Sequence, residues 1–151
     1  MVSKYLSDSV DLDDYSKEGF KMKANQRSAN IDIKEKISIL WIVVMINMIF
    51  ADILSFMLPG FLNDINTGNT PFGITQEILL VFALILEIPI VMIFLSRILK
   101  NKFNRWANII ASLITIIFGI GGGSLALHYI FFATVEVLVL LLIIRYAWEL
   151  K

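Results

Sequence analysis

The sequence predicts an all-α, multi-pass membrane protein: a bundle of four transmembrane helices with both chain termini in the cytoplasm. Hydrophobic residues make up 58% of the 151 residues and charged residues 17%, whereas a soluble domain has about 25% charged residues. Four apolar stretches follow a polar N-terminal segment, and each is close to the ~20 residues that cross a bilayer. We therefore place the chain in the cell membrane, in contact with the lipid bilayer.

Residues 1–32 form the polar segment, which we expect to be a mobile cytoplasmic tail. Acidic residues and lysines are mixed there without the apolar core of a secretory signal, so we expect no cleavage. Residues 33–151 are expected to form one four-helix transmembrane domain. Its spans are placed at about residues 37–58, 76–96, 107–126 and 129–148.

Local signals bound these spans. Asp32 is followed three residues later by Glu35, which is the spacing of an N-terminal capping box, so we expect the first helix to begin there. The Pro59–Gly60 pair ends that helix. Thr75 can cap the second helix. The glycine-rich turn 121–124 joins the third and fourth helices as a tight hairpin.

The distribution of basic residues predicts the orientation. Lysines and arginines are enriched on cytoplasmic flanks. In this chain they lie before the first span, between the second and third spans and at the C-terminal end of the fourth, and the other two loops contain none. The tryptophans fall at the same predicted cytoplasmic ends, where amphipathic rings favour the headgroup layer: Trp41, Trp106 and Trp148. Both termini are therefore expected in the cytoplasm.

Three carboxylates lie within the apolar spans: Asp52, Glu87 and Glu136. With a rise of ~1.5 Å per residue, Asp52 and Glu136 lie roughly 10 Å, and Glu87 roughly 15 Å, from the outer ends of their helices, so the three could share one layer. An ionised carboxylate at this depth costs at least ~2.5 kcal/mol, and no lysine or arginine lies there. We expect the three acids to be protonated or to bind a cation, and they predict a ligand-binding or proton-binding site. In the alternative, protonated carboxyls hydrogen-bond between helices and stabilise the bundle.

Two further polar residues extend the predicted site. His128 lies eight residues before Glu136 on a similar helix face and could reach it through a water molecule. Asn47 is expected to form a hydrogen bond between helices. Pro89 frees a backbone carbonyl and kinks the helix within one turn of Glu87. With no cysteine and a single histidine, the chain lacks cysteine-based zinc sites and two-histidine haem ligation, and we expect neither a metal nor a cofactor.

A stripe of small residues follows one side of the third span at intervals of four. These residues let another backbone approach closely: Ala107, Ala111, Thr115, Gly119 and Gly123. We expect this packing seam to face a neighbouring helix of the same chain, and a second protomer in a homodimer is the alternative. Asn108 and Ser112 lie near the same face and could provide hydrogen-bond partners to the acids.

The composition and motifs narrow the function to two classes. The 13 basic and 13 acidic residues cancel, so no overall field attracts nucleic acid. We find no catalytic residues, because the sequence contains no Ser/His/Asp array, phosphate loop or zincin motif. The first class is a proton-coupled transporter, or a binder of a cationic or amphipathic small molecule, that uses the three acids. The second is a structural or regulatory protein that partners another membrane protein, with the acids as interhelical hydrogen-bonding groups.

Five short segments carry a family resemblance: residues 50–55, 59–60, 104–109, 135–136 and 146–148. They resemble an uncharacterised bacterial family of short four-span membrane proteins, a domain of unknown function, over roughly residues 33–149. The resemblance implies the fold and draws attention to Asp52 and Glu136, but it implies no reaction. In topology alone the chain is also similar to small multidrug exporters. Those proteins place their key glutamate in the first helix, where this chain has Asp52 near the outer end.

Overall fold

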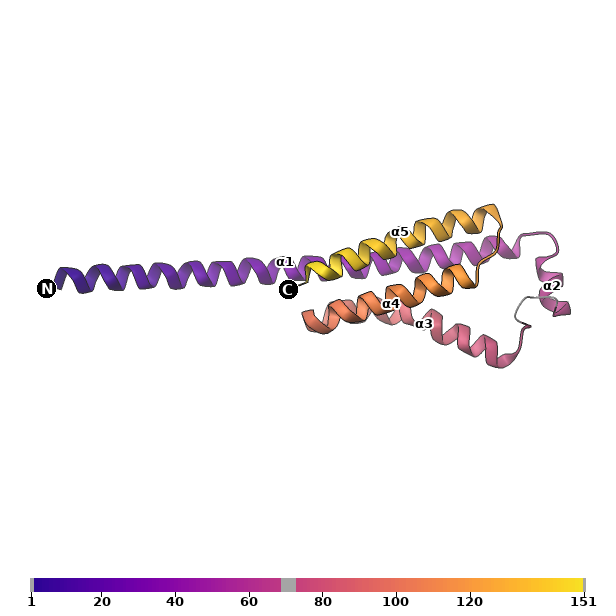
Figure 1. Ribbon diagram of the computed structural model, residues 1–151, viewed down its shortest axis with the longest axis horizontal. Coiled ribbons are helices and arrows are strands. Elements are labelled where there is room, and N and C mark those ends of the chain that lie inside the picture. Colours follow the sequence, from indigo (N-terminus) through magenta and orange to yellow (C-terminus); the bar gives the residue numbers. More distant parts are fainter. Residues whose placement is uncertain (1, 69–72, 151) are drawn as a thin grey trace. The chain divides into compact units, whose positions relative to one another are not determined.

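The computed structural model describes residues 2–68 and 73–150, with side chains from residue 17 onward. Every regular element in these ranges is a helix (Figure 1). Four helices are long and apolar enough to cross a membrane, so the predicted all-α, four-span architecture is confirmed. The helices are α1 (Val2–Phe56), α2 (Phe61–Thr67), α3 (Gln76–Ile98), α4 (Asn101–Gly121) and α5 (Leu127–Glu149).

The chain divides into two units, residues 1–32 and residues 33–151. In the first unit, residues 2–32 are helical and belong to α1, so the expected helix start at Asp32 is wrong. A capping residue must leave the helical conformation, and no glycine or proline between Gly19 and Pro59 interrupts the helix. The motif at Asp32 therefore lies inside a helix that began earlier. The second unit is called the bundle below.

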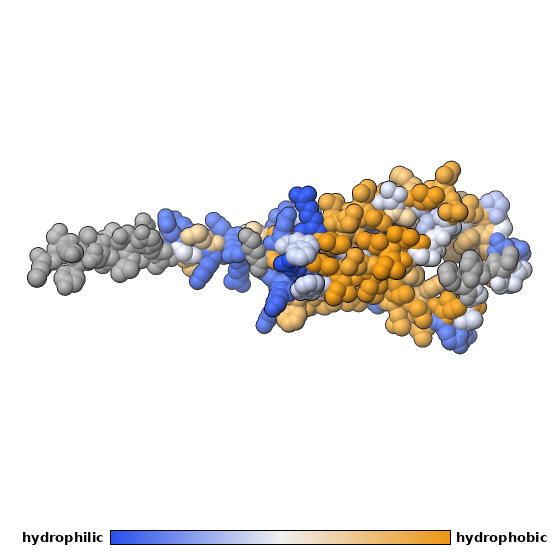
Figure 2. Space-filling model, viewed as in Figure 1, coloured by the Kyte–Doolittle hydropathy of each residue, from blue (hydrophilic) through white to orange (hydrophobic). Residues whose placement is uncertain are grey.

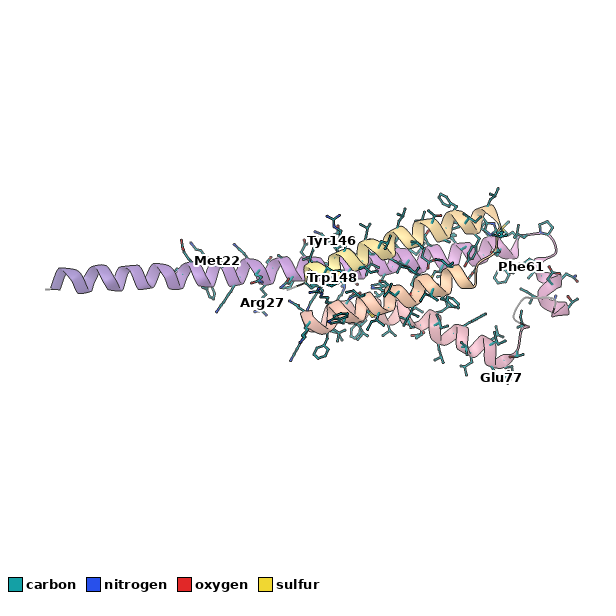
Figure 3. The ribbon with its side chains drawn as sticks, in the orientation of Figure 1. Met22, Arg27, Phe61, Glu77, Tyr146 and Trp148 are labelled. Carbon is teal, nitrogen blue, oxygen red and sulfur yellow. The ribbon has the colours of Figure 1, made fainter. Side chains whose placement is uncertain are left out.

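The bundle has two ends that differ in chemistry. The short α3–α4 connection and the C-terminal end of α5 lie at one end, which we call the α3–α4 end. The helix α2 and the α4–α5 connection lie at the other, which we call the α2 end (Figure 1). Tyr146 and Trp148 mark the α3–α4 end, and Phe61 and Glu77 mark the α2 end (Figure 3). Lys100 of the α3–α4 connection and the basic residues beside it in α3 and α4 belong to the former end.

Apolar side chains cover the outside of the bundle. Leu84, Ile117 and Leu138 are each more than half exposed, and Figure 2 shows an apolar belt between two hydrophilic ends. Exposing this surface to water would cost about 25 cal/mol per Å². The interior is more polar, because Asn104 and Asn108 are fully buried. This distribution, with apolar side chains outside and amide side chains inside, is the one expected of a protein in contact with the bilayer.

The core is concentrated at the α3–α4 end. Ile37, Trp41 and Val44 of α1 meet Leu140 and Ile143 of α5, and all five are fully buried. The first half of α3 has no buried residue, and its backbone diverges from α4 and α5 toward the α2 end (Figure 1). The fully buried apolar side chains therefore gather toward one end of the bundle.

Trp41 does not face outward from the bundle, as a ring anchored in the headgroup layer would. Its side chain is fully buried, and its indole Nε1 donates a hydrogen bond to Asn108 Oδ1 over 2.7 Å. An indole N–H inside a membrane protein needs an acceptor, and an amide on the facing helix provides it. Trp106 and Trp148 are about half exposed, at 53% and 54%, and the guanidinium of Arg105 lies 3.7 Å from the centroid of the Trp148 ring.

The Trp41–Asn108 bond belongs to a buried hydrogen-bond network that joins α1, α3 and α4. Asn108 Nδ2 donates to the carbonyl of Asn104 over 2.8 Å, and Asn104 Nδ2 donates to the carbonyl of Ser96 on α3. Ser38 Oγ on α1 donates to the carbonyl of Ile93 over 2.7 Å. These bonds fix three helices to one another at the α3–α4 end.

Several boundaries differ from the expected ones. The third span begins at Asn101, six residues earlier than expected, and only Leu99 and Lys100 separate it from α3. Polar residues such as Lys102 and Arg105 resemble a loop in sequence, but they belong to the first turns of α4. The third span ends at Gly121, because the following glycines do not continue a helix.

The segment between Pro59 and Thr75 contains the short helix α2, which the sequence analysis did not predict. Gly60 and Gly68 flank it with φ values of 88° and 70°, a conformation that glycine adopts without steric cost. The predicted cap of the next helix is confirmed, because Thr75 Oγ1 accepts a hydrogen bond from Ile78 N over 3.3 Å.

Candidate functional site

A cavity of about 200 Å³ lies in the bundle toward the α2 end. Asp52 of α1 and Glu136 of α5 both line it, so the structure brings two of the three intramembrane acids together. The remaining lining residues are apolar or aromatic side chains and glycines from four helices and the α4–α5 connection: Met48, Ala51, Phe82, Leu86, Phe118, Gly119, Gly122, Tyr129 and Ala133. None of the described lining residues is basic.

Glu136 is buried, with 7% of its surface exposed. Its carboxyl group lies against Gly119 of α4, where an added Cβ would stand 3.2 Å from Oε1. That separation is tighter than ordinary van der Waals contact, so a side chain at position 119 would displace the carboxyl group. The glycine of the packing seam therefore makes the room that Glu136 occupies.

Tyr129 packs on the same part of α4. Its hydroxyl donates a hydrogen bond to the carbonyl of Gly119 over 2.9 Å. A Cβ at Gly123 would lie 2.5 Å from Tyr129 Cε1, so the ring fills the space beside that glycine. Two residues of the predicted packing seam thus contact α5 of the same chain. Ala111 and Thr115 of the seam are buried, and Ala107 is half-buried.

Asp52 lies near the end of its helix and is exposed. Because α1 ends at Phe56, Asp52 is only about 6 Å from the end of the helix. The two acids therefore differ: Glu136 is buried and Asp52 is accessible at the α2 end. Two negative charges in one cavity of low dielectric repel each other, so a proton or a bound cation lowers their energy.

Glu87 does not line this cavity. It is exposed on α3, whereas its neighbours Phe82 and Leu86 face the cavity. Phe82 also contacts Phe118 of α4, with ring centroids 5.5 Å apart. The sequence predicted a similar depth for Glu87 and the other acids, but the Glu87 side chain points away from the cavity. Successive residues of a helix point about 100° apart, so Glu87 cannot share the direction of Leu86. Pro89, two residues further along, is buried.

His128 contacts α1 near Asp52. Its Nε2 lies 3.1 Å from Ser55 Oγ, and Ser55 Oγ donates its single hydrogen to the carbonyl of Ala51 over 2.8 Å. His128 Nε2 must therefore be the donor in its bond to Ser55. His128 links the start of α5 to the last turn of α1, and the structure shows no contact between it and Glu136.

Asn47 does not form the expected bond between helices. Its Nδ2 donates to the carbonyl of Val43 in its own helix over 3.1 Å. Asn108 and Thr115 likewise bond elsewhere than to the acids: Asn108 to Trp41 and Asn104, and Thr115 Oγ1 to the carbonyl of Ala111 over 2.9 Å. Polar side chains in a membrane take the nearest acceptor, which is often a carbonyl of the preceding turn.

Tyr129 and Ser55 were not predicted as site residues. The spacing of each residue from a predicted acid could have identified it. Tyr129 lies seven residues before Glu136 and so shares its helix face. Ser55 lies three residues after Asp52, one turn along α1. Within the described side chains no group of three histidine, aspartate or glutamate residues is placed to bind a metal ion.

These features define a class of protein: a small, multi-pass helical membrane protein with an apolar outer surface and a carboxylate-lined interior cavity. Residues 26–151 match the family of unknown function DUF6326, and the chain belongs to this family. The expected membership of an uncharacterised family is therefore confirmed, and the match includes Asp52, Tyr129 and Glu136. The chain matches no curated protein and no solved structure.

Proposed function

We propose that this protein is a small transporter or binding protein of the cell membrane that binds a proton or a cationic small molecule between Asp52 and Glu136. One observation supports the proposal above all: carboxyl groups from α1 and α5 line a single cavity, and no described residue around it is basic. A proton or a cation offsets the cost of at least ~2.5 kcal/mol that an ionised carboxylate has within the membrane.

The hydrogen bonds of the bundle support a binding role over a purely structural one. In the described part of the chain, α1 is bonded to α3 and α4 through Ser38 and Trp41, and to α5 through Ser55. Neither Asp52 nor Glu136 takes part in any of these bonds. The acids are therefore not needed to join the helices, and their carboxyl oxygens are available to a ligand.

The position of Asp52 supports access from the α2 end. With the termini in the cytoplasm, as the basic residues indicate, this end faces the outside of the cell. The chain has no cysteine, so single cysteines report the orientation without background. A membrane-impermeant maleimide should label Thr67→Cys in intact cells and Lys102→Cys only after permeabilisation. The reverse pattern would contradict the orientation.

The proposed site is tested with tetramethylammonium, a compact cation, and the purified protein in lipid nanodiscs. Glu136→Gln and Asp52→Asn remove the charges and should each lower the affinity about tenfold or more. Glu87→Gln is the matched control, because Glu87 does not line the cavity, and it should bind as the wild type does. In liposomes, the same two variants should lose any proton movement that accompanies uptake of the cation. Unchanged binding in both Glu136→Gln and Asp52→Asn would exclude the proposed site.

The exposed position of Glu87 supports a second candidate function, that of a structural protein. In this role the chain would associate with a second copy of itself through α3. The first half of α3 has no buried residue, and Glu87 is exposed in the middle of this apolar span. A carboxyl group facing acyl chains is costly, and in a two-fold dimer it can pair with its own counterpart. The mass of the protein–detergent complex tests this candidate. A monomeric wild type, or a dimer unaffected by Glu87→Leu, would exclude it.

A further inference from the structure

A second hollow lies beside the cavity. It is a groove of about 390 Å³ between α4 and α5 at the α2 end, which we call the α4–α5 groove. Its walls are mainly apolar, with Ile120 from α4 and Ile130 and Leu138 from α5. These three side chains are exposed at 67%, 47% and 58%, so the groove opens on the outer surface of the bundle. Its volume falls within the range of about 300–1,000 Å³ found for small-molecule sites.

The α4–α5 groove and the acidic cavity share a wall. Gly119, Tyr129 and Ala133 line both of them. Tyr129 separates the two, because its ring packs beside Gly123 of the groove and its hydroxyl bonds to the carbonyl of Gly119. Tyr129 therefore lines the acidic cavity, which contains two carboxyl groups, and it also lines the apolar α4–α5 groove on the outer surface.

We propose that the α4–α5 groove binds the apolar chain of an amphipathic cation whose head group lies between Asp52 and Glu136. The proposal rests on the proposed function and names the ligand class of that site. Charge complementarity identifies the head group, since the cavity has two carboxyl groups and no described basic residue. The apolar walls next to it identify the tail. An amphipathic cation concentrates in the bilayer, which the open side of the groove contacts.

Two probes with the same head group test the proposal: tetramethylammonium, and octyltrimethylammonium, which adds a linear chain. Binding is measured by calorimetry in lipid nanodiscs, with empty nanodiscs as the blank for partitioning. Wild-type protein should bind octyltrimethylammonium about tenfold or more tighter than tetramethylammonium, because the chain fills an apolar groove.

Variants that fill the α4–α5 groove should separate the two probes. Leu138→Trp should lower the affinity for octyltrimethylammonium about fivefold or more and leave tetramethylammonium binding unchanged. Ile120→Trp fills the groove from the facing helix and should act in the same way. Leu141→Trp is the matched control, because Leu141 is 51% exposed on the same helix and does not line the groove. All three positions are on the surface, so the substitutions should not prevent folding.

The outcomes distinguish the two proposals. If the two probes bind equally, or if Leu138→Trp and Ile120→Trp both bind octyltrimethylammonium as Leu141→Trp does, the tail site is excluded while the proposed function stands. If neither probe binds the wild type, the tail site and the binding of an organic cation both fail, and only the proton-binding arm of the proposed function stands. If both groove variants weaken only the probe with the chain, and Glu136→Gln weakens both probes, the ligand class is supported.

Discussion

Gly119 determines where the acid of α5 can lie. The position next to its Cα is occupied by the Glu136 carboxyl group, and its carbonyl accepts the hydrogen bond of Tyr129. A methyl group there would meet Glu136 Oε1 at 3.2 Å, so the carboxyl group would have to move. Because Gly119 has a hydrogen atom in place of a side chain, the Glu136 carboxyl group has room to lie in the cavity.

We expect Gly119→Ala to lower the free energy of unfolding by about 1–3 kcal/mol through overpacking. It should also weaken tetramethylammonium binding, because Glu136 is displaced. Denaturant unfolding, monitored by tryptophan fluorescence, measures the change in the free energy of unfolding. Calorimetry measures the change in tetramethylammonium affinity. Gly121→Ala is the control, since a Cβ at Gly121 meets nothing within 4 Å. Equal behaviour of the two variants would show that position 119 tolerates a side chain.

Trp41 is a buried hydrogen-bond donor, because its indole N–H bonds to Asn108 inside the bundle. Removing its N–H by Trp41→Phe leaves Asn108 Oδ1 without the bond it receives from α1. An unsatisfied buried acceptor costs about 1–3 kcal/mol, and denaturant unfolding should show a loss of that size. Trp106→Phe should change stability by less than about 0.5 kcal/mol, because Trp106 is 53% exposed. A smaller loss for Trp41→Phe than for Trp106→Phe would contradict this account.

At the α2 end, a side-chain hydrogen bond between His128 and Ser55 connects α1 to α5. Ser55→Ala removes it and should increase hydrogen exchange at the amides of residues 127–131, because the start of α5 opens more often. Thr134→Ala is the control, since Thr134 Oγ1 bonds only to the carbonyl of Ile130 in its own helix, over 2.7 Å. Equal exchange in the two variants would show that the bond does not hold α5 in place.

The sequence predicted the elements well where a signal is local. Thr75 caps α3 and the glycines at 121–123 end α4, because capping and helix termination depend on neighbouring residues alone. The signal at Asp32 failed for the same reason: a capping motif contains no information about the backbone before it. The start of α4 was placed late because hydropathy identifies the apolar part of a span and not the polar turns that extend it.

The candidate site was predictable in part. Depth along a helix follows from residue number, and Asp52 and Glu136, which were predicted at a similar depth, line the same cavity. Rotation and divergence of a helix do not follow from residue number. Glu87 therefore points away from the cavity although its depth suits it, and Trp41 points inward although its position suits the headgroup layer.

At the scale of the whole molecule, the acidic cavity should make cation binding depend on pH. A cation binds the ionised carboxylates, and a proton competes for the same oxygens. The affinity for tetramethylammonium should therefore fall as the pH is lowered from about 8 to about 5, because protonation neutralises the site. Calorimetry across this range measures the effect. Glu87→Gln should keep the full pH dependence, and a pH-independent affinity in the wild type would count against competition between proton and cation.

The uneven distribution of bonds in the bundle has a mechanical consequence. Hydroxyl, amide and indole hydrogen bonds join α1, α3 and α4 at the α3–α4 end, while the first half of α3 packs against α4 through Phe82 and Phe118. Pro89, which lacks a backbone donor, lies between the two regions. Bending of α3 at Pro89 would therefore change the space beside Phe82 without breaking the hydrogen bonds that Ile93 and Ser96 accept at the α3–α4 end.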